Sequence, residues 1–195
     1  MVRTFVAVVL VLVAGDAAAH TGQPGGATGF VAGLLHPITG IDHLLAMLAV
    51  GMWGAQLGMP ALWILPVAFP IVMAIGGALG ILGVPLPHAE TAIVLSVVLL
   101  GAAIAWGRRP PLALAAALVA FFAIFHGHAH GAELPQQASA VAYSAGFVLA
   151  TGSIHLTGIG IGFVTRLPRG DGLLRVGGAA ITLAGFVLAW RLAGG

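Results

Sequence analysis

The chain is a succession of apolar stretches of about twenty residues, each ended by Pro, Gly or Arg. Hydrophobic residues make up 60% of its 195 residues and charged residues only 6%, whereas a soluble domain carries roughly 25% charged residues. A chain so poor in charge cannot cover a surface that faces water. Lipid must therefore be the solvent for most of it, and the sequence predicts an all-α membrane protein.

Six transmembrane helices are expected, at about 37–58, 60–83, 88–106, 111–131, 136–165 and 172–193. Each stretch is close to or above the ~20 residues that cross ~30 Å of hydrocarbon. Pro60, Pro111 and the pair Gly170 and Gly172 stand where helix starts and breaks are expected. We expect residues 20–195 to form one transmembrane domain, a single six-helix bundle.

The first 19 residues have the three parts of a cleavable signal peptide. Arg3 precedes an apolar run from Phe5 to Ala14, and small residues end at Ala19. The run is about ten residues, too short to span a bilayer; a first helix that stays attached is the alternative. Cleavage after Ala19 leaves His20 as the mature N-terminus, where the α-amine and the imidazole can chelate a late divalent ion together.

The arginines predict the orientation in the membrane. With a cleaved signal peptide the mature N-terminus lies outside, so the links between helices three and four and between five and six lie on the cytoplasmic side. The positive-inside rule gives the same answer, because these links hold Arg108, Arg109, Arg166, Arg169 and Arg175. We therefore expect a multi-pass protein of the bacterial inner (plasma) membrane with both mature termini in the periplasm.

Several function classes are excluded by what the chain lacks. The pI of about 10.5 rests on seven Arg against five acids, and no basic face exists to follow phosphates, so nucleic acid is not a partner. Without Cys there are no disulfides, iron–sulfur clusters or thiolate metal sites. Without Lys there is no Walker A loop and no Schiff-base cofactor. We expect no prosthetic group, and transport that is not driven by ATP hydrolysis in this chain.

A first polar motif, His36-Pro-Ile-Thr-Gly-Ile-Asp42-His43, opens the first apolar stretch. His36 and His43 are seven residues apart and would share one face of a helix, while Asp42 would point roughly 100° away, towards a neighbouring helix. An ionisable group in a membrane helix costs at least ~2.5–3.5 kcal/mol, so it needs a partner or a function. Two histidines beside Asp42 favour function over a simple interhelical hydrogen bond.

A second motif, Phe125-His126-Gly-His128-Ala-His130-Gly-Ala-Glu133, closes the fourth stretch on the outer side. His126 and His130 stand at i and i+4 and can hold one ion together if the helix continues. His128 would face elsewhere unless Gly127 loosens the turn. A short tract rich in histidine is typical of metal binding. Imidazole and carboxylate without thiolate suit Ni, Co, Cu(II) or Zn.

Two further histidines are weaker candidates. His155 is the one histidine expected deep in the membrane, where it is either a ligand on an ion pathway or a hydrogen-bonding residue between helices. His88, two residues before Glu90, opens the third stretch on the outer side. It is either a feeding site for the metal or the hydrated end of a helix.

The two motifs resemble the signatures of the HupE/UreJ family of nickel/cobalt permeases. The resemblance extends over essentially the whole chain, from the signal peptide and the N-terminal histidine through six helices with both motifs in order. The family is associated with nickel supply to hydrogenase and urease, so these enzymes would be indirect partners. The resemblance implies that the metal-handling positions are His36, Asp42, His43, His126 and His130.

Together, the residues and the resemblance predict a secondary transporter that imports Ni²⁺ or Co²⁺. The ion would be captured on the outer side by His20, His88 and the tract 126–130. It would then pass to the first motif and move onward past His155. Zn²⁺ and Cu²⁺ as cargo, channel or carrier action, and a homo-oligomer all stay open.

Two other classes compete with a transporter. An intramembrane zinc hydrolase would use three histidines to hold the ion and Asp42 or Glu133 to activate water. A haem protein of the membrane would use pairs of histidines as axial ligands.

Overall fold

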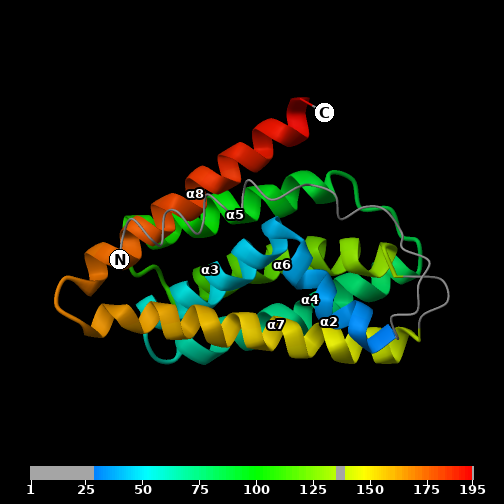
Figure 1. Cartoon of the computed structure of the whole chain (residues 1–195), viewed down its shortest axis with the longest axis horizontal. Helices are drawn as coiled ribbons and strands as arrows, with labels where there is room; N and C mark the ends of the chain where they lie inside the picture. The colour runs from blue at the N-terminus through cyan, green and yellow to red at the C-terminus, as the bar shows by residue number, and fades with distance from the viewer. Residues whose placement is uncertain (1–28, 135–138, 195) are drawn as a thin grey trace.

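A computed structural model describes residues 29–134 and 139–194, and within these ranges all regular structure is helical. This confirms the expected all-α class. The signal peptide and His20 lie outside the described residues. The elements are α2 (Gly29–Thr39), α3 (Ile41–Leu57), α4 (Ala61–Ile81), α5 (Ala89–Trp106), α6 (Leu112–Ala132), α7 (Ala140–Gly162), the 3₁₀ helix η1 (Phe163–Arg166) and α8 (Gly170–Gly194), shown in Figure 1.

Five of the described helical stretches are long and apolar enough to cross a membrane. They are α4, α5, α6, α7 together with η1, and α8, with mean hydropathies of 1.7 to 2.2. Helices α2 and α3 meet the same criterion only when they are taken together. The described chain therefore has five spans, or six if α2 and α3 together form one further, broken span. The ends of α4, α5, α6 and α8 fall within two residues of the expected positions.

The single first helix expected at 37–58 is wrong. The helix begins at Gly29 and breaks at Gly40, and α2 and α3 are bent by 79° at this break. Gly40 has extended backbone angles (φ −81°, ψ 105°), a conformation that interrupts the helical hydrogen bonds. Pro37, the first residue of the expected helix, is buried inside α2. The two histidines of the first motif therefore lie on different helices.

Helix α3 lies at the centre of the bundle. It contacts α2, α4, α5, α7 and α8, and nearly all its residues from Leu45 to Gly54 are buried. On the outer helices, by contrast, large apolar side chains such as Val67, Leu183 and Phe186 are exposed. A chain of this size in water would not expose so much apolar surface, and lipid accounts for it.

Helices α4 and α6 meet closely through glycine. A Cβ added at Gly127 on α6 would overlap the carbonyl of Met73, and one added at Gly76 on α4 would overlap the carbonyl of Ile124. The two backbones therefore touch, as small residues allow between membrane helices. This contact fixes the part of α6 that carries the second histidine motif.

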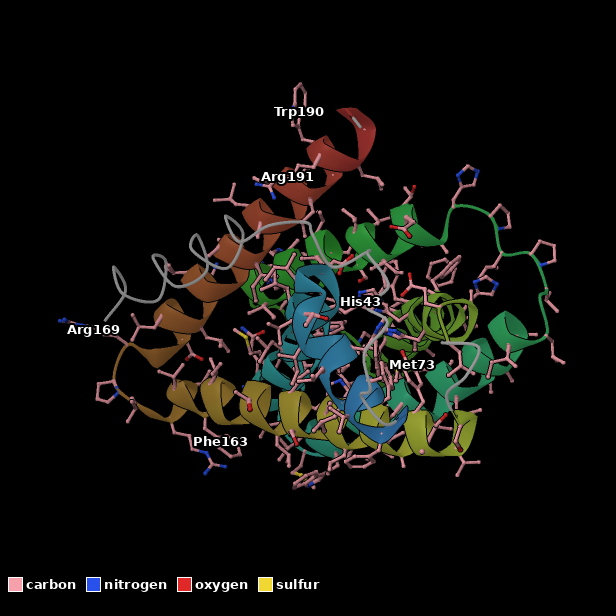
Figure 2. All side chains as sticks on the ribbon, turned by 45° about the vertical axis from the view of Figure 1, so that its right-hand side comes forward. His43, Met73, Phe163, Arg169, Trp190 and Arg191 are labelled. Carbon is pink, nitrogen blue, oxygen red and sulfur yellow. The ribbon has the colours of Figure 1, made fainter. Side chains whose placement is uncertain are left out.

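The two ends of the bundle differ in their polar residues (Figure 1). The link between α4 and α5 and the end of α6 lie at one end, here called the histidine end. The links 107–111 and 163–169 lie at the other, here called the arginine end because Arg108, Arg109, Arg166 and Arg169 are there. In Figure 2, Arg169 and Trp190 project from the bundle, while His43 lies in its interior.

Candidate metal site

Four histidines from three helices meet in the half of the bundle nearer the histidine end. The ring of His130 is 4.7 Å from that of His36 and 4.4 Å from that of His43, measured between centroids. The rings of His43 and His126 are 4.8 Å apart. These four side chains, with the adjoining carboxylates of Asp42 and Glu133, are called the histidine cluster below.

The bend at Gly40 is what assembles the cluster. His36 lies in the last turn of α2 and His43 in the first turn of α3, so the expectation that they share a helical face is wrong. They meet instead because both rings contact His130 on α6. Helix α6 continues without a break to Ala132, so His126 and His130 do lie one turn apart on one buried face, as expected.

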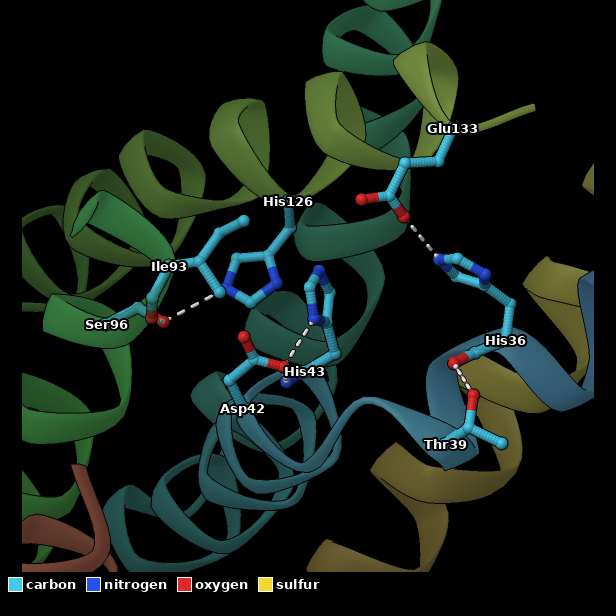
Figure 3. Close-up of polar contacts among 8 residues, drawn as sticks. All are labelled: His36, Thr39, Asp42, His43, Ile93, Ser96, His126 and Glu133. Carbon is cyan, nitrogen blue, oxygen red and sulfur yellow. Dashed lines mark hydrogen bonds and ion pairs between the residues drawn. The ribbon is translucent and has the colours of Figure 1, made fainter. Parts of the chain in front are cut away.

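The hydrogen bonds of His126 fix which of its nitrogens can bind a metal. The Ser96 hydroxyl donates to the carbonyl of Ile93, so its oxygen accepts the bond from Nε2 of His126, 3.0 Å away. Nε2 then carries the proton, and Nδ1 is left with its lone pair. Nδ1 is buried and has no hydrogen-bond partner in the described chain. Figure 3 shows it turned towards His43.

His43 is held in the same way by a carboxylate. Oδ1 of Asp42 accepts from Nδ1 of His43 at 2.8 Å and from its backbone N–H at 2.8 Å (Figure 3). Nε2 of His43 therefore carries a lone pair, and within the described chain it is buried without a partner. A carboxylate that receives the second N–H of a histidine is a common support for a metal ligand. Asp42 was expected to face a neighbouring helix, whereas this partner is on its own helix.

His130 links the buried pair to the exposed end of the cluster. Both of its ring nitrogens are buried without a hydrogen-bond partner among the described residues. Nε2 of His36 lies 3.1 Å from a carboxylate oxygen of Glu133. One ligand atom from each of His36, His130 and Glu133 fits within a mutual distance of 4.8 Å. These three residues could hold one ion together.

Charge and exposure both suit a divalent cation that enters from the histidine end. With neutral imidazoles, the two carboxylates of the cluster give it a formal charge of −2, which one divalent ion neutralises. The side chains of His36 and Glu133 are 30% and 40% exposed and that of His43 is 12% exposed, whereas His130 and His126 are 5% and 0% exposed. The ligands thus lead from solvent into the bundle.

The remaining candidates from the sequence lie outside the cluster. Nε2 of His128 is 2.7 Å from the carbonyl of Val84, in the link between α4 and α5, so this side chain turns away from the cluster, as expected. His88 is exposed directly before α5, with a positive φ of 60°, and Glu90 is exposed in the first turn. His155 is buried in α7.

Three residues around the cluster were not among those expected from the sequence. Ser96 is a single hydroxyl in an apolar run, and that isolation was the available signal. Tyr143 lies with its ring 6.0 Å from that of His36, and its hydroxyl is buried without a hydrogen-bond partner in the described chain. The Phe69 ring lies 5.4 Å from both His126 and His155. No pattern in the sequence marks these two aromatic residues.

Spanning helices around a buried cluster of imidazoles with unpaired nitrogens define a multi-pass membrane protein with a candidate site for a transition metal. The family model described as HupE / UreJ protein matches residues 8–188, and the chain belongs to this family. It is also 49% identical to Protein HupE of Rhizobium leguminosarum bv. viciae over 170 residues, which are 87% of this chain and 88% of that protein. No solved structure matches the chain. These findings confirm the family resemblance and support a membrane protein associated with nickel or cobalt transport.

Proposed function

We propose that this chain is a secondary transporter that imports Ni²⁺ or Co²⁺ through the histidine cluster. The observation that carries the proposal is the graded series of ligands, from the half-exposed His36 and Glu133 to the fully buried His126. A site that only stored a metal would not need ligands at successive depths. A path that strips water from an ion step by step does need them.

The residues divide the work by depth. Glu133 and His36 replace part of the hydration shell where water is still present. His130 contacts both His36 and His43, so it can take the ion from the first and pass it to the second. Asp42 holds the ring of His43 through Nδ1, so that the lone pair of Nε2 stays on the side of the cluster.

The arginine end defines the proposed direction. Four arginines lie in the links at that end, so the positive-inside rule places it in the cytoplasm. The histidine cluster then opens towards the periplasm, and transport through it is import. The protein would lie in the bacterial inner membrane with both mature termini in the periplasm, and it would supply nickel indirectly to enzymes such as hydrogenase or urease.

A test of the function is total cellular metal, measured by mass spectrometry in a strain that lacks its own nickel importers. Cells that express the chain should accumulate Ni²⁺ or Co²⁺, and cells with His43→Ala at equal membrane abundance should not. His128→Ala is the matched control, because this histidine comes from the same motif but hydrogen-bonds the Val84 carbonyl. It should accumulate metal as the unchanged chain does.

The same experiment separates the transporter from the zinc hydrolase. A hydrolase retains one ion and leaves the metal content of the cell unchanged. Unchanged nickel and cobalt, together with one tightly held zinc per purified chain, would therefore replace the transporter with the hydrolase. None of the described contacts favours the hydrolase.

A further inference from the structure

One face of α7 continues inward from the histidine cluster. It carries four residues spaced by four positions, and all are buried: Tyr143, Phe147, Thr151 and His155. Residues at this spacing lie one above the other on a helix. The first two contact the cluster, because Tyr143 lies beside His36 and the Phe147 ring is 4.2 Å from that of His130. The last two lie deeper.

The two deeper residues, Thr151 and His155, have buried polar side-chain atoms without hydrogen-bond partners in the described chain. Thr151 is 0% exposed and its hydroxyl has no partner in the described chain. His155 is 2% exposed, and neither ring nitrogen makes a hydrogen bond of ordinary geometry. By contrast, the hydroxyls of Ser153 and Thr157 on the outer face of α7 donate to carbonyls of their own helix. A buried polar group left unpaired costs about 1–3 kcal/mol, so it calls for a ligand or a function.

A backbone oxygen faces the same place from α4. Pro70 has no N–H, so the carbonyl of Pro66 lacks the helical donor it would otherwise have four residues later. This carbonyl is within reach of the His155 ring. The imidazole of His155 and a main-chain oxygen of α4 therefore lie near each other, and buried Thr151 lies one helical turn from His155 on the same face of α7.

This place is separate from His43, the cluster histidine on α3. Helices α3 and α7 touch where a Cβ at Gly51 would overlap the carbonyl of His155. Gly51 is eight residues beyond His43 on α3, about 12 Å along the helix. The His155 side chain leans back by a few Å towards the cluster. A metal–imidazole bond is only ~2.1 Å long, so one ion cannot bind both His155 and His43.

We propose that His155, Thr151 and the carbonyl of Pro66 form a second cation site, the inner site, which Ni²⁺ or Co²⁺ occupies after it leaves the histidine cluster. The inner site rests on the transport function proposed above. It offers one imidazole and two neutral oxygens, with no carboxylate among them. It therefore binds the ion more weakly than the cluster does, as an ion that must move on requires. The Phe69 ring, which touches both His126 and His155, marks the boundary between the two sites.

The absence of cysteine from the chain allows a direct spectroscopic test. Thr151→Cys places the only thiol of the full-length protein at the inner site. A thiolate bound to Co²⁺ gives an intense charge-transfer absorption in the near ultraviolet, whereas the imidazoles of the cluster give only weak visible bands. The purified Thr151→Cys protein, titrated with Co²⁺, should show both kinds of band. Thr157→Cys, on the lipid-facing side of α7, should show only the visible bands.

A second variant tests His155 itself. Adding His155→Leu to Thr151→Cys should abolish the charge-transfer band or weaken it at least tenfold, and the visible bands of the cluster should persist. His155→Asn retains a hydrogen-bonding side chain and should still lower Ni²⁺ uptake into proteoliposomes at least tenfold.

The outcomes separate the two proposals. Visible cobalt bands without a charge-transfer band in Thr151→Cys would overturn the inner site and leave the histidine cluster intact. Normal uptake by His155→Asn would show that His155 serves only packing, and would also overturn it. If the unchanged chain neither binds Co²⁺ nor moves Ni²⁺, the transport function fails, and the inner site fails with it.

Discussion

The contact between Asp42 and His43 predicts how one negative charge controls metal binding. Oδ1 of Asp42 accepts two hydrogen bonds from His43, each 2.8 Å long. Asp42→Asn keeps an oxygen at this position and removes the charge. The hydrogen bond to the ring therefore survives in a weaker form, and Nδ1 no longer has a strong reason to keep the proton.

The expected loss can be worked out from this geometry. A hydrogen bond to a charged group contributes about 1.5–3 kcal/mol, and one between neutral groups about 0.5–1.5 kcal/mol. Changing a residue that supports a metal ligand typically lowers metal affinity about 10–100-fold, which is roughly 1.4–2.8 kcal/mol. Asp42→Asn loses only the difference between the charged and the neutral hydrogen bond to the ring, about 1–1.5 kcal/mol. It should therefore weaken Co²⁺ binding by about tenfold, the lower end of that range.

The measurement is a Co²⁺ titration, followed by visible absorption, of four purified proteins: the unchanged chain, Asp42→Asn, His43→Ala and the double variant. If Asp42 acts through His43, its substitution should change affinity less than about twofold once His43 is gone, because the pair is then uncoupled. Asp171→Asn, an exposed carboxylate in the first turn of α8, is the control and should bind Co²⁺ normally.

The reasoning is refuted if Asp42→Asn lowers affinity by the same factor in both backgrounds. Asp42 would then act on the ion without His43, as a direct ligand or by charge alone. An Asp42→Asn protein with unchanged affinity would also refute it, because the charge would then have no role.

Three further predictions concern the surroundings of the cluster. Ser96→Ala removes the acceptor of the His126 Nε2–H. It should lower the free energy of unfolding by about 1–3 kcal/mol, which thermal unfolding measures, and it should weaken Co²⁺ binding in the titration described above. Gly127→Ala should push α4 away from α6 at the Met73 carbonyl and lower the unfolding temperature by several degrees. Gly160→Ala is the control, because a Cβ there meets nothing within 4 Å, and it should leave the unfolding temperature unchanged. An unchanged unfolding temperature in Gly127→Ala as well would contradict the close contact between α4 and α6. Metal affinity should fall reversibly on acidification, because imidazole must be neutral to bind a metal; an affinity that stays the same until the protein unfolds in acid would argue against imidazole ligands.

The local sequence was enough to predict the long helices. Runs such as 61–81 and 112–125 are apolar on every face, so lipid selects helices there whatever their neighbours do. The break at Gly40 was not predicted, because Pro37 and Gly40 are each compatible with a helix start or a helix interior. The bend depends on where α2 packs against α7 and where α3 packs against its five neighbouring α-helices.

The candidate site was predicted in part for the same reason. The four histidines of the cluster were identified by residue type and spacing, because imidazoles are rare and costly in lipid. The ring nitrogen of His126 that carries the proton was not predicted, since this depends on Ser96, which lies 30 residues from His126 in the chain. The partnership of His36 with Glu133 likewise joins α2 to the end of α6.

The sequence by itself determined the solvent of this protein, the class of its fold and the residue types available to bind a metal, because these depend on composition and on short spacings. The tertiary structure alone decided which nitrogens carry lone pairs, which histidines lie together and which face away. It also placed Thr151 and His155 one turn apart on a buried face of α7. Coordination requires atoms within a few ångströms of each other, and only packing between distant segments sets such distances.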